Sequence, residues 1–415
     1  MSVEKFNVVA LGPSGSGKTV YLAALQERLR TQDPELGFHV RLPRDQERKL
    51  TEVYSEVASS GDWPAPTDRT ETPEWTFTCR MWTRFGVFET MQIEYIDYAG
   101  EHLTHPVGEG SQVQDWFEER LETADALLGL LDGVKIRGLL FGNRGAEDFL
   151  RDDLAPMFSL MQGFPGPIHF VVTKWDLVEQ NFTLADVRQR LMREPTFSQL
   201  VASRAPGKTR RFPVPPGRIR LIPVSAVGRG FAVLDSEGKV RKLDRTNPKP
   251  MNVEIPLVSV LPDLCVRAYE ALRISEARRA AGQDPQQDQE AGQGQDLGQD
   301  PGDQSEAGAP GSPGRVRKLL AAGLSPQLQA QLMKSGITVS PAVLAGFLDA
   351  ALGALGQLAS RSPREVRRAK RLQRSWRGRR VKSVKDEKSA VHHTVHRLVG
   401  QLGEFERAEP DSILA

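Results

Sequence analysis

The sequence predicts an α/β fold in which a mostly parallel sheet is flanked by helices. Three observations lead to this prediction. Near-continuous apolar runs, typical of strands buried on both faces, alternate with segments of helical periodicity. A glycine-rich turn follows the first apolar run and opens the first helical segment. The composition changes sharply near residue 276, which marks the end of the alternating part.

The apolar runs are the expected strands, and helical segments fill the intervals between them. The expected strands are Phe6–Leu11, Trp75–Met81, Gln92–Ile96, Ala126–Leu131, Ile168–Thr173 and Ile219–Val224, with Phe38–Leu42 as a candidate for a further short strand. The expected helices are Lys18–Thr31, Gln46–Ser60, Val113–Thr123, Ala146–Met161, Leu184–Met192 and Pro256–Ala277. Strands that alternate with helices in this way favour a parallel sheet covered on both faces.

Three regions follow from the composition. Residues 1–275 form the α/β domain. Residues 276–314 are rich in Gln, Gly, Asp and Pro, and they predict a disordered linker because they cannot bury enough apolar surface to offset their ordering entropy. Residues 315–415 predict a small helical region with helices at Pro326–Ser335, Ala342–Ser360, Pro363–Gly378 and Ser389–Phe405. The sequence leaves open whether the linker lets the two parts close onto each other.

Charge and cysteine usage indicate which cellular compartment and which partners the sequence favours. The chain has 55 Lys and Arg against 53 Asp and Glu, so any affinity for nucleic acid or membrane must be local. Cys79 and Cys265 show no metal-ligand spacing, which favours a reducing cytoplasm. The first residues lack the features of a signal peptide. The most apolar segment, Ala342–Ala359, contains Asp349 and Gln357, so we expect no transmembrane segment.

The turn after the first strand has the pattern of a phosphate-binding loop. Residues 12–19, GPSGSGKT, fit GxxxxGK[ST] between a strand and a helix. Glycines let the backbone N–H groups converge on phosphate oxygens, and the helix N-terminus adds its dipole. Lys18 is expected to contact the β- and γ-phosphates and to act in catalysis, and the Thr19 hydroxyl to ligate Mg²⁺. The expected phosphate-binding residues are Gly12, Ser14, Gly15, Ser16, Gly17, Lys18, Thr19 and Val20.

Two further strand ends carry the residues expected around the metal and the base. Asp97 ends one strand and Gly100 follows it; Asp97 is expected to hold Mg²⁺, and the Gly100 N–H to contact the γ-phosphate. Thr173, Lys174 and Asp176 end another strand. The Asp176 carboxylate can accept two hydrogen bonds from guanine, which adenine cannot donate.

Ser225 and Ala226 end the last strand in a segment that resembles the SA[KL] motif of GTPases, and this resemblance implies that the Ala226 N–H contacts the guanine oxygen. Each of these motifs ends a strand, and open α/β sheets bind their ligands at that edge.

Together the motifs resemble those of the TRAFAC-class P-loop GTPases. More narrowly, GPSGSGKTVYLAAL followed by DYAGEH is similar to the bacterial double-GTPase type domains of predicted conflict and defence systems. The resemblance implies GTP or GDP and Mg²⁺ as ligands. The chain has one phosphate-binding loop, so it would supply at most one member of a GTPase pair.

Two positions depart from the GTPase pattern. Ras-like proteins use a Thr before the second strand to ligate Mg²⁺; here Thr67 and Thr70 are both candidates, and the choice stays open. Glu101 follows Gly100, where Ras-like proteins carry a Gln that orients water, and it is a candidate catalytic residue because its carboxylate could accept a hydrogen bond from water. A carboxylate near a phosphate is unfavourable, so we expect slow or partner-dependent hydrolysis, with an arginine from Arg69 or from another protein.

The region 361–388 is strongly basic. It is rich in Arg and Lys, contains Trp376, and has Glu365, Asp386 and Glu387 as its acidic residues. Three interpretations remain: binding to nucleic acid or an anionic membrane surface, contact with a protein effector, or a solvated helix face.

The favoured function is a GTP-hydrolysing molecular switch. The alternatives are a scaffold that keeps GTP bound without hydrolysis, which Glu101 motivates, and a P-loop ATPase or kinase, against which Asp176 argues.

Overall fold

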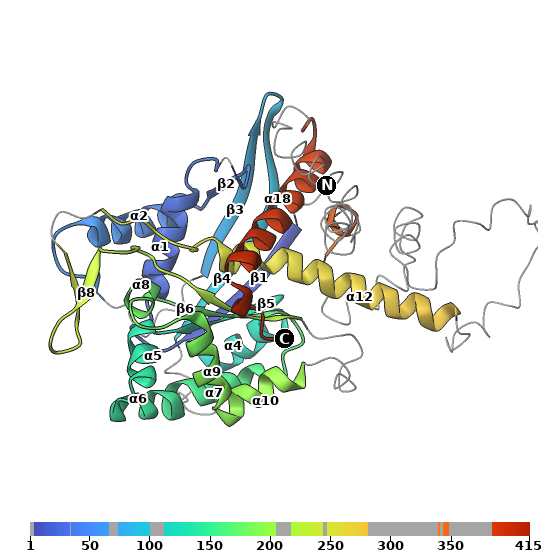
Figure 1. The fold of residues 1–415 in the computed structure, drawn as a ribbon. Coiled ribbons are helices and arrows are strands. Elements are labelled where there is room, and N and C mark those ends of the chain that lie inside the picture. The colour runs from blue at the N-terminus through green and yellow to red at the C-terminus, as the bar shows by residue number, and fades with distance from the viewer. Residues whose placement is uncertain are drawn as a thin grey trace, which may run out of the picture.

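A seven-stranded sheet forms the centre of the computed structural model, which describes residues 4–33, 35–65, 74–99, 112–204, 217–243, 247–280, 339–340, 343–347 and 384–415 (Figure 1). The strand order is β2-β3-β4-β1-β5-β6-β7. Strands β4, β1, β5, β6 and β7 run parallel to one another, and β3 is antiparallel to both of its neighbours, β2 and β4. The strands are β1 Glu4–Gly12, β2 His39–Arg41, β3 Glu74–Thr83, β4 Gly86–Ala99, β5 Ala126–Leu131, β6 Ile168–Val172 and β7 Ile219–Pro223. The predicted α/β fold class is therefore confirmed.

Helices cover both faces of this sheet. They are α1 Lys18–Leu29, α2 Arg44–Ala58, α4 Gln112–Glu122, α5 Gly133–Leu140, α6 Arg144–Asp148, α7 Ala155–Met161, α8 Trp175–Val178, α9 Leu184–Met192, α10 Pro195–Ser203, α11 Ile255–Val258, α12 Val260–Ala280 and α18 Glu387–Ala408. The helix expected at Ala146–Met161 is interrupted by a π-helical turn, Phe149–Leu154, between α6 and α7. A small antiparallel hairpin, β8 Ala232–Leu234 and β9 Val240–Lys242, follows the sheet.

The apolar runs are continuous because the central strands are buried on both faces. Along β1, Phe6, Val8 and Ala10 join one core cluster, whereas Val9 and Leu11 join the other. The first cluster packs under α1, α12 and α18, and the second under α5, α7, α9 and α10. Because β4, β1, β5, β6 and β7 run parallel, their carboxyl ends, and the polar residues that follow them, lie at one edge of the sheet.

The helix α18 belongs to this same core. Leu398 and Phe405 are buried in the first cluster, and Figure 1 shows α18 lying beside β3, β4 and α12. After α18, Leu414 N donates to Ile219 O over 2.9 Å, so the chain runs along the outer edge of β7. The sequence left open whether the C-terminal part closes onto the α/β domain, and for α18 the structure shows that it does. Most of residues 276–386, and with them the expected linker, lie outside the described residues.

Candidate functional site

The turn between β1 and α1 has the backbone that its glycines predict. Gly15 and Gly17 have φ angles of +75° and +85°, a left-handed region that other residues rarely adopt. Gly12 serves a different purpose, because a Cβ there would lie 3.0 Å from both Leu130 Cβ and Leu130 O. Gly12 thus permits β1 to pack closely on β5, whereas Gly15 and Gly17 shape the loop.

The loop presents donors to an anion. Helix α1 has no acidic side chain in its first turn, so its free N–H groups and dipole favour a negative ligand. Lys18 Nζ lies 2.8 Å from Gly12 O and 3.9 Å from Asp97 Oδ1. The Ser16 hydroxyl is buried and has no hydrogen-bond partner among the described residues. These groups form a cradle that suits phosphate oxygens.

Asp97 lies at the carboxyl end of β4, level with Ala10 on β1. The side chain is 5% exposed, and its Oδ1 atom lacks a hydrogen-bond partner within the described part of the chain. Burial raises the pKa of Asp97 to about 6, although the Lys18 ammonium opposes this shift. A divalent cation favours oxygen ligands and would keep this carboxylate ionised. Asp97 and the hydroxyl of Thr19, which lines the same cavity, therefore fit a Mg²⁺ site.

Thr173 and Lys174 connect the end of β6 to the phosphate-binding loop. The Thr173 hydroxyl donates to Ser16 O over 2.7 Å and Leu131 O lies 3.1 Å from it. Lys174 has a φ angle of +51°, and its Nζ donates to Gly15 O over 2.9 Å and to Asp132 Oδ2 over 2.8 Å. A left-handed non-glycine residue is strained, and such strain is concentrated at functional sites. Thr173 thus positions the phosphate-binding loop, while the aliphatic part of the Lys174 side chain extends along that loop.

Asp176 is held rigidly at the other end of the same motif. Its side chain is 3% exposed, and Oδ1 accepts a 2.6 Å hydrogen bond from Ser225 Oγ. Ser225 Oγ in turn accepts from Gly228 N over 2.7 Å. Burial raises the pKa of Asp176, and the Ser225 hydrogen bond opposes the shift. Ser225 therefore lies behind Asp176, and its hydroxyl orients the Oδ1 atom of that carboxylate.

One cavity of ≈ 720 Å³ brings most of the expected residues together. Its lining includes Ser14, Gly15, Ser16, Gly17, Lys18, Thr19, Val20, Asp97, Thr173, Lys174, Asp176 and Ala226. Gly12 and Ser225 do not line this cavity. They support residues that do. Thr67, Thr70, Gly100 and Glu101 lie outside the described residues.

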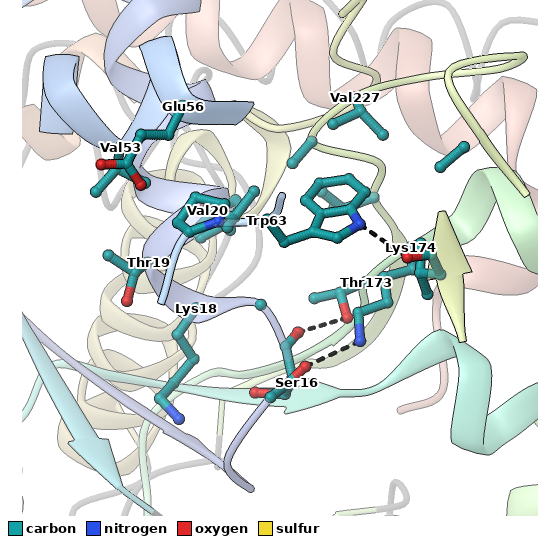
Figure 2. Close-up of a pocket in the computed structure, with 18 of the residues that line it drawn as sticks. Ser16, Lys18, Thr19, Val20, Val53, Glu56, Trp63, Thr173, Lys174 and Val227 are labelled. Carbon is teal, nitrogen blue, oxygen red and sulfur yellow. Dashed lines mark hydrogen bonds between the residues drawn. The ribbon is translucent and has the colours of Figure 1, made fainter. Parts of the chain in front are cut away.

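Sequence reasoning missed the opposite wall of this cavity. Lys49, Glu52, Val53 and Glu56 of α2, Trp63, and Ala232, Lys239 and Val240 of the β8–β9 hairpin line it. Trp63 Nε1 donates to Val240 O over 2.9 Å, and its ring meets the Phe231 ring at a centroid distance of 6.2 Å. Figure 2 shows the Trp63 indole between the loop residue Ser16 and Val227. The only signal for this wall in the sequence is the DSEGKV turn at Gly238, which predicts a hairpin but does not predict that the hairpin lines the cavity.

Comparison with known proteins agrees with the motifs. Residues 9–140 match the sequence model of the family described as Double-GTPase 1. The matched part contains the phosphate-binding loop and Asp97 and ends before Thr173. Over these residues the chain is similar to the double-GTPase family, which confirms the resemblance drawn from the motifs and supports a GTP-binding protein.

A search of the curated proteins found no match. Among solved structures, the chain is similar to one described as the signal recognition particle receptor SRb-GTP/SRX complex from Chaetomium thermophilum. The identity is 15%, the TM-score is 0.27, and the match covers 55% of this chain and 94% of that one.

Proposed function

We propose that this double-GTPase-type chain binds GTP and GDP with Mg²⁺ in the cavity described above, and that it hydrolyses GTP slowly or with the help of a partner. One observation carries the proposal. The phosphate cradle at Gly15–Lys18 and the buried Asp176 face a single cavity, and hydrogen bonds from Thr173 and Lys174 join them. A fixed spacing between a phosphate site and a base site is what nucleotide recognition requires.

The proposed roles follow from the geometry. The loop amides and Lys18 bind the phosphates, and Asp97 and Thr19, together with Thr67 or Thr70, ligate the metal. Asp176 and the Ala226 N–H read guanine. When bound, Mg²⁺ would neutralise the charge that develops on the phosphates.

Slow hydrolysis is proposed because Glu101 stands where a neutral water-orienting side chain is expected. A second negative charge beside a triphosphate repels it and raises the barrier. The chain would then act as a cytoplasmic switch that waits for a partner, either a protein effector or a paired GTPase, in a bacterial conflict or defence system. The second candidate function, a scaffold with permanently bound GTP, rests on this same residue. Rapid turnover of GTP by the purified chain alone would exclude the scaffold and the slow switch together.

The deciding experiment is a titration of the purified protein with GTP, GDP, ATP and xanthosine triphosphate in the presence of Mg²⁺. We expect GTP and GDP to bind about 100-fold more tightly than ATP, because ATP leaves the buried Asp176 carboxylate unpaired. The Asp176→Asn substitution exchanges an acceptor for a donor, so GTP should bind about tenfold or more weakly and xanthosine triphosphate more tightly.

The Asp148→Asn variant is the matched control. Asp148 is an exposed carboxylate on α6 that pairs with Arg151, and it does not line the cavity. Equal affinities for ATP and GTP would overturn the guanine assignment and leave a P-loop ATPase or kinase as the better description.

A further inference from the structure

The β3–β4 hairpin carries an exposed apolar tip. The two strands pair as far as Thr83 and Gly86, and the connection between them is Arg84-Phe85. Trp82, Phe85 and Val87 are 49%, 50% and 54% exposed. Tight turns normally carry polar residues or glycine, so a half-exposed Phe in this turn is unusual. Figure 1 shows this hairpin extending away from the rest of the sheet.

The tip is held in place by specific contacts, so its exposure is not the result of fraying. The Gln32 side chain bonds the Trp82 backbone twice, accepting from its N–H over 2.6 Å and donating to its carbonyl over 3.3 Å. The Trp82 ring lies 4.5 Å from the ring of buried His39. Thr83 Oγ1 accepts from Phe85 N and donates to Gly86 O, each over 3.0 Å. A pre-organised apolar surface of this kind indicates a binding role.

The β3–β4 tip also carries a positively charged residue, Arg84. The Arg84 guanidinium lies 4.5 Å from the centroid of the Phe85 ring. On the opposite face of the hairpin, Val384 packs with Met81 and Phe88. The sequence that leads into Val384, residues 361–383, contains eleven Arg and Lys residues and one acidic residue, Glu365. The segment that precedes Val384 in the sequence is therefore strongly basic, and Val384 itself packs on the hairpin that carries the apolar tip.

We propose that the β3–β4 tip docks on an anionic lipid bilayer, with Trp82, Phe85 and Val87 entering the boundary between headgroups and acyl chains and Arg84 meeting lipid phosphates. Aromatic residues favour the membrane interface, and clustered Lys and Arg are attracted to anionic headgroups. Among the described residues, no helix has the length and apolarity to cross a bilayer. Docking at the hairpin tip would therefore be peripheral.

The docking surface is separate from the nucleotide cavity. The tip is at the amino end of β4, and Asp97 is near the carboxyl end of the same strand. Ten residues of extended strand lie between Gly86 and Asp97, so the two are about 35 Å apart. Substitutions at the tip should therefore change lipid binding and leave nucleotide affinity unchanged.

The test is flotation of the full chain with vesicles of phosphatidylcholine alone and of phosphatidylcholine mixed with phosphatidylserine. The Phe85→Ser variant removes the exposed ring. The Phe141→Ser variant is its matched control, because Phe141 is 52% exposed and the Arg137 guanidinium lies 4.9 Å from its ring centroid. We expect the wild type to float with the anionic vesicles and to detach as salt is raised. Phe85→Ser should bind on the order of tenfold less, and Phe141→Ser should bind like the wild type.

Unchanged melting curves will show that all three proteins are folded. The proposal is overturned if the wild type does not float, if Phe85→Ser floats like the wild type, or if Phe141→Ser loses as much binding as Phe85→Ser. It is also overturned if the tip variant loses binding to single-stranded RNA and not to vesicles, which would assign the same aromatic and basic chemistry to nucleic acid.

Discussion

Asp97 is buried, and among the described residues its Oδ1 atom has no hydrogen-bond partner. Its carboxylate is 5% exposed, and Lys18 Nζ at 3.9 Å is too distant to compensate fully for lost hydration. The pKa of about 6 is above the ordinary value of 3.8, so the folded protein holds a proton that the unfolded chain releases. The free energy of unfolding should therefore fall as the pH rises from about 4 through 6.

Removing the charge should consequently stabilise the metal-free protein. We expect Asp97→Asn to unfold at a higher temperature than the wild type at about pH 7.5, with an advantage that shrinks by about 1 kcal/mol when the pH is lowered to about 5. The same variant should lose the dependence of GTP affinity on Mg²⁺. Thermal unfolding and nucleotide titration, each with and without Mg²⁺, measure the two effects. A variant that is less stable than the wild type at both pH values would contradict this account.

At this scale the motif residues could be predicted, because a phosphate or a guanine edge requires particular groups at particular spacings. The role of Ser225 could not. The sequence predicted it as a nucleotide-binding residue, whereas its hydroxyl lies behind Asp176 in the structure. A motif fixes which residues are near the ligand, but the direction of a short side chain depends on backbone bonds such as Ser225 N to Met251 O.

Among the elements, α2 and the β8–β9 hairpin are tied together around Trp63. Lys242 Nζ donates to the carbonyls of Glu56, Ser59 and Asp62 at the end of α2, over 2.7, 3.3 and 2.9 Å. The same ammonium lies 5.1 Å from the Trp63 ring centroid. The cation therefore binds carbonyls in the last turn of α2 and just beyond it, and it supports the aromatic wall of the cavity.

Trp63 should accordingly contribute to binding of the nucleoside rather than the phosphates. We expect Trp63→Leu to weaken GTP and GDP equally, by on the order of tenfold, because both share the base and ribose. Titration with both nucleotides checks this, and Trp82→Leu is the control because Trp82 is exposed at the remote β3–β4 tip. An effect on GTP without an effect on GDP would place Trp63 near the γ-phosphate and refute the assignment.

The elements with a strong hydrophobic period were the ones that sequence could locate. The expected strand Gln92–Ile96 is the buried half of β4, whereas the structure extends β4 back to Gly86. Val87 and its neighbours are exposed at the tip, so the sequence there shows no alternation of buried apolar and exposed polar residues that would predict a strand. The short helix α8 was missed because it is fixed by tertiary contacts and is too short to show a period. For β8–β9 the sequence indicated the turn at Gly238 but not where the hairpin packs.

For the whole molecule, a buried ion network joins the sheet to helices α12 and α18. Arg220 of β7 is fully buried and bonds Asp263 of α12 through both oxygens, at 2.6 Å each, and Glu406 of α18 at 2.6 Å. His169 Nε2 of β6 lies 3.0 Å from Asp263. Burial alone would raise the pKa of Asp263, but the Arg220 guanidinium and the hydrogen bonds from Arg220 and His169 outweigh it and lower the pKa. This network contributes stability above the ordinary Asp pKa, and the contribution is lost as the pH falls.

The position of α18 leads to a prediction about the full chain. If a site for a specific protease is inserted within residues 281–314 and cut, the C-terminal fragment should stay bound to the rest. Leu398 and Phe405 are buried in the main core, and the Glu406 carboxylate pairs with Arg220. Gel filtration after cleavage should therefore give one peak that contains both fragments.

The Leu398→Asp variant should release the fragment, because an unpaired carboxylate in that core costs several kcal/mol. Glu404→Gln on the exposed face of α18 is the matched control and should retain it. Separation of the wild-type fragments would mean that residues 315–415 form an independent unit, as their composition first indicated. If the wild-type fragment is retained and Leu398→Asp releases it, α18 completes the GTPase-like core. A partner that binds the basic segment would then act directly on the sheet that positions Asp97 and Asp176.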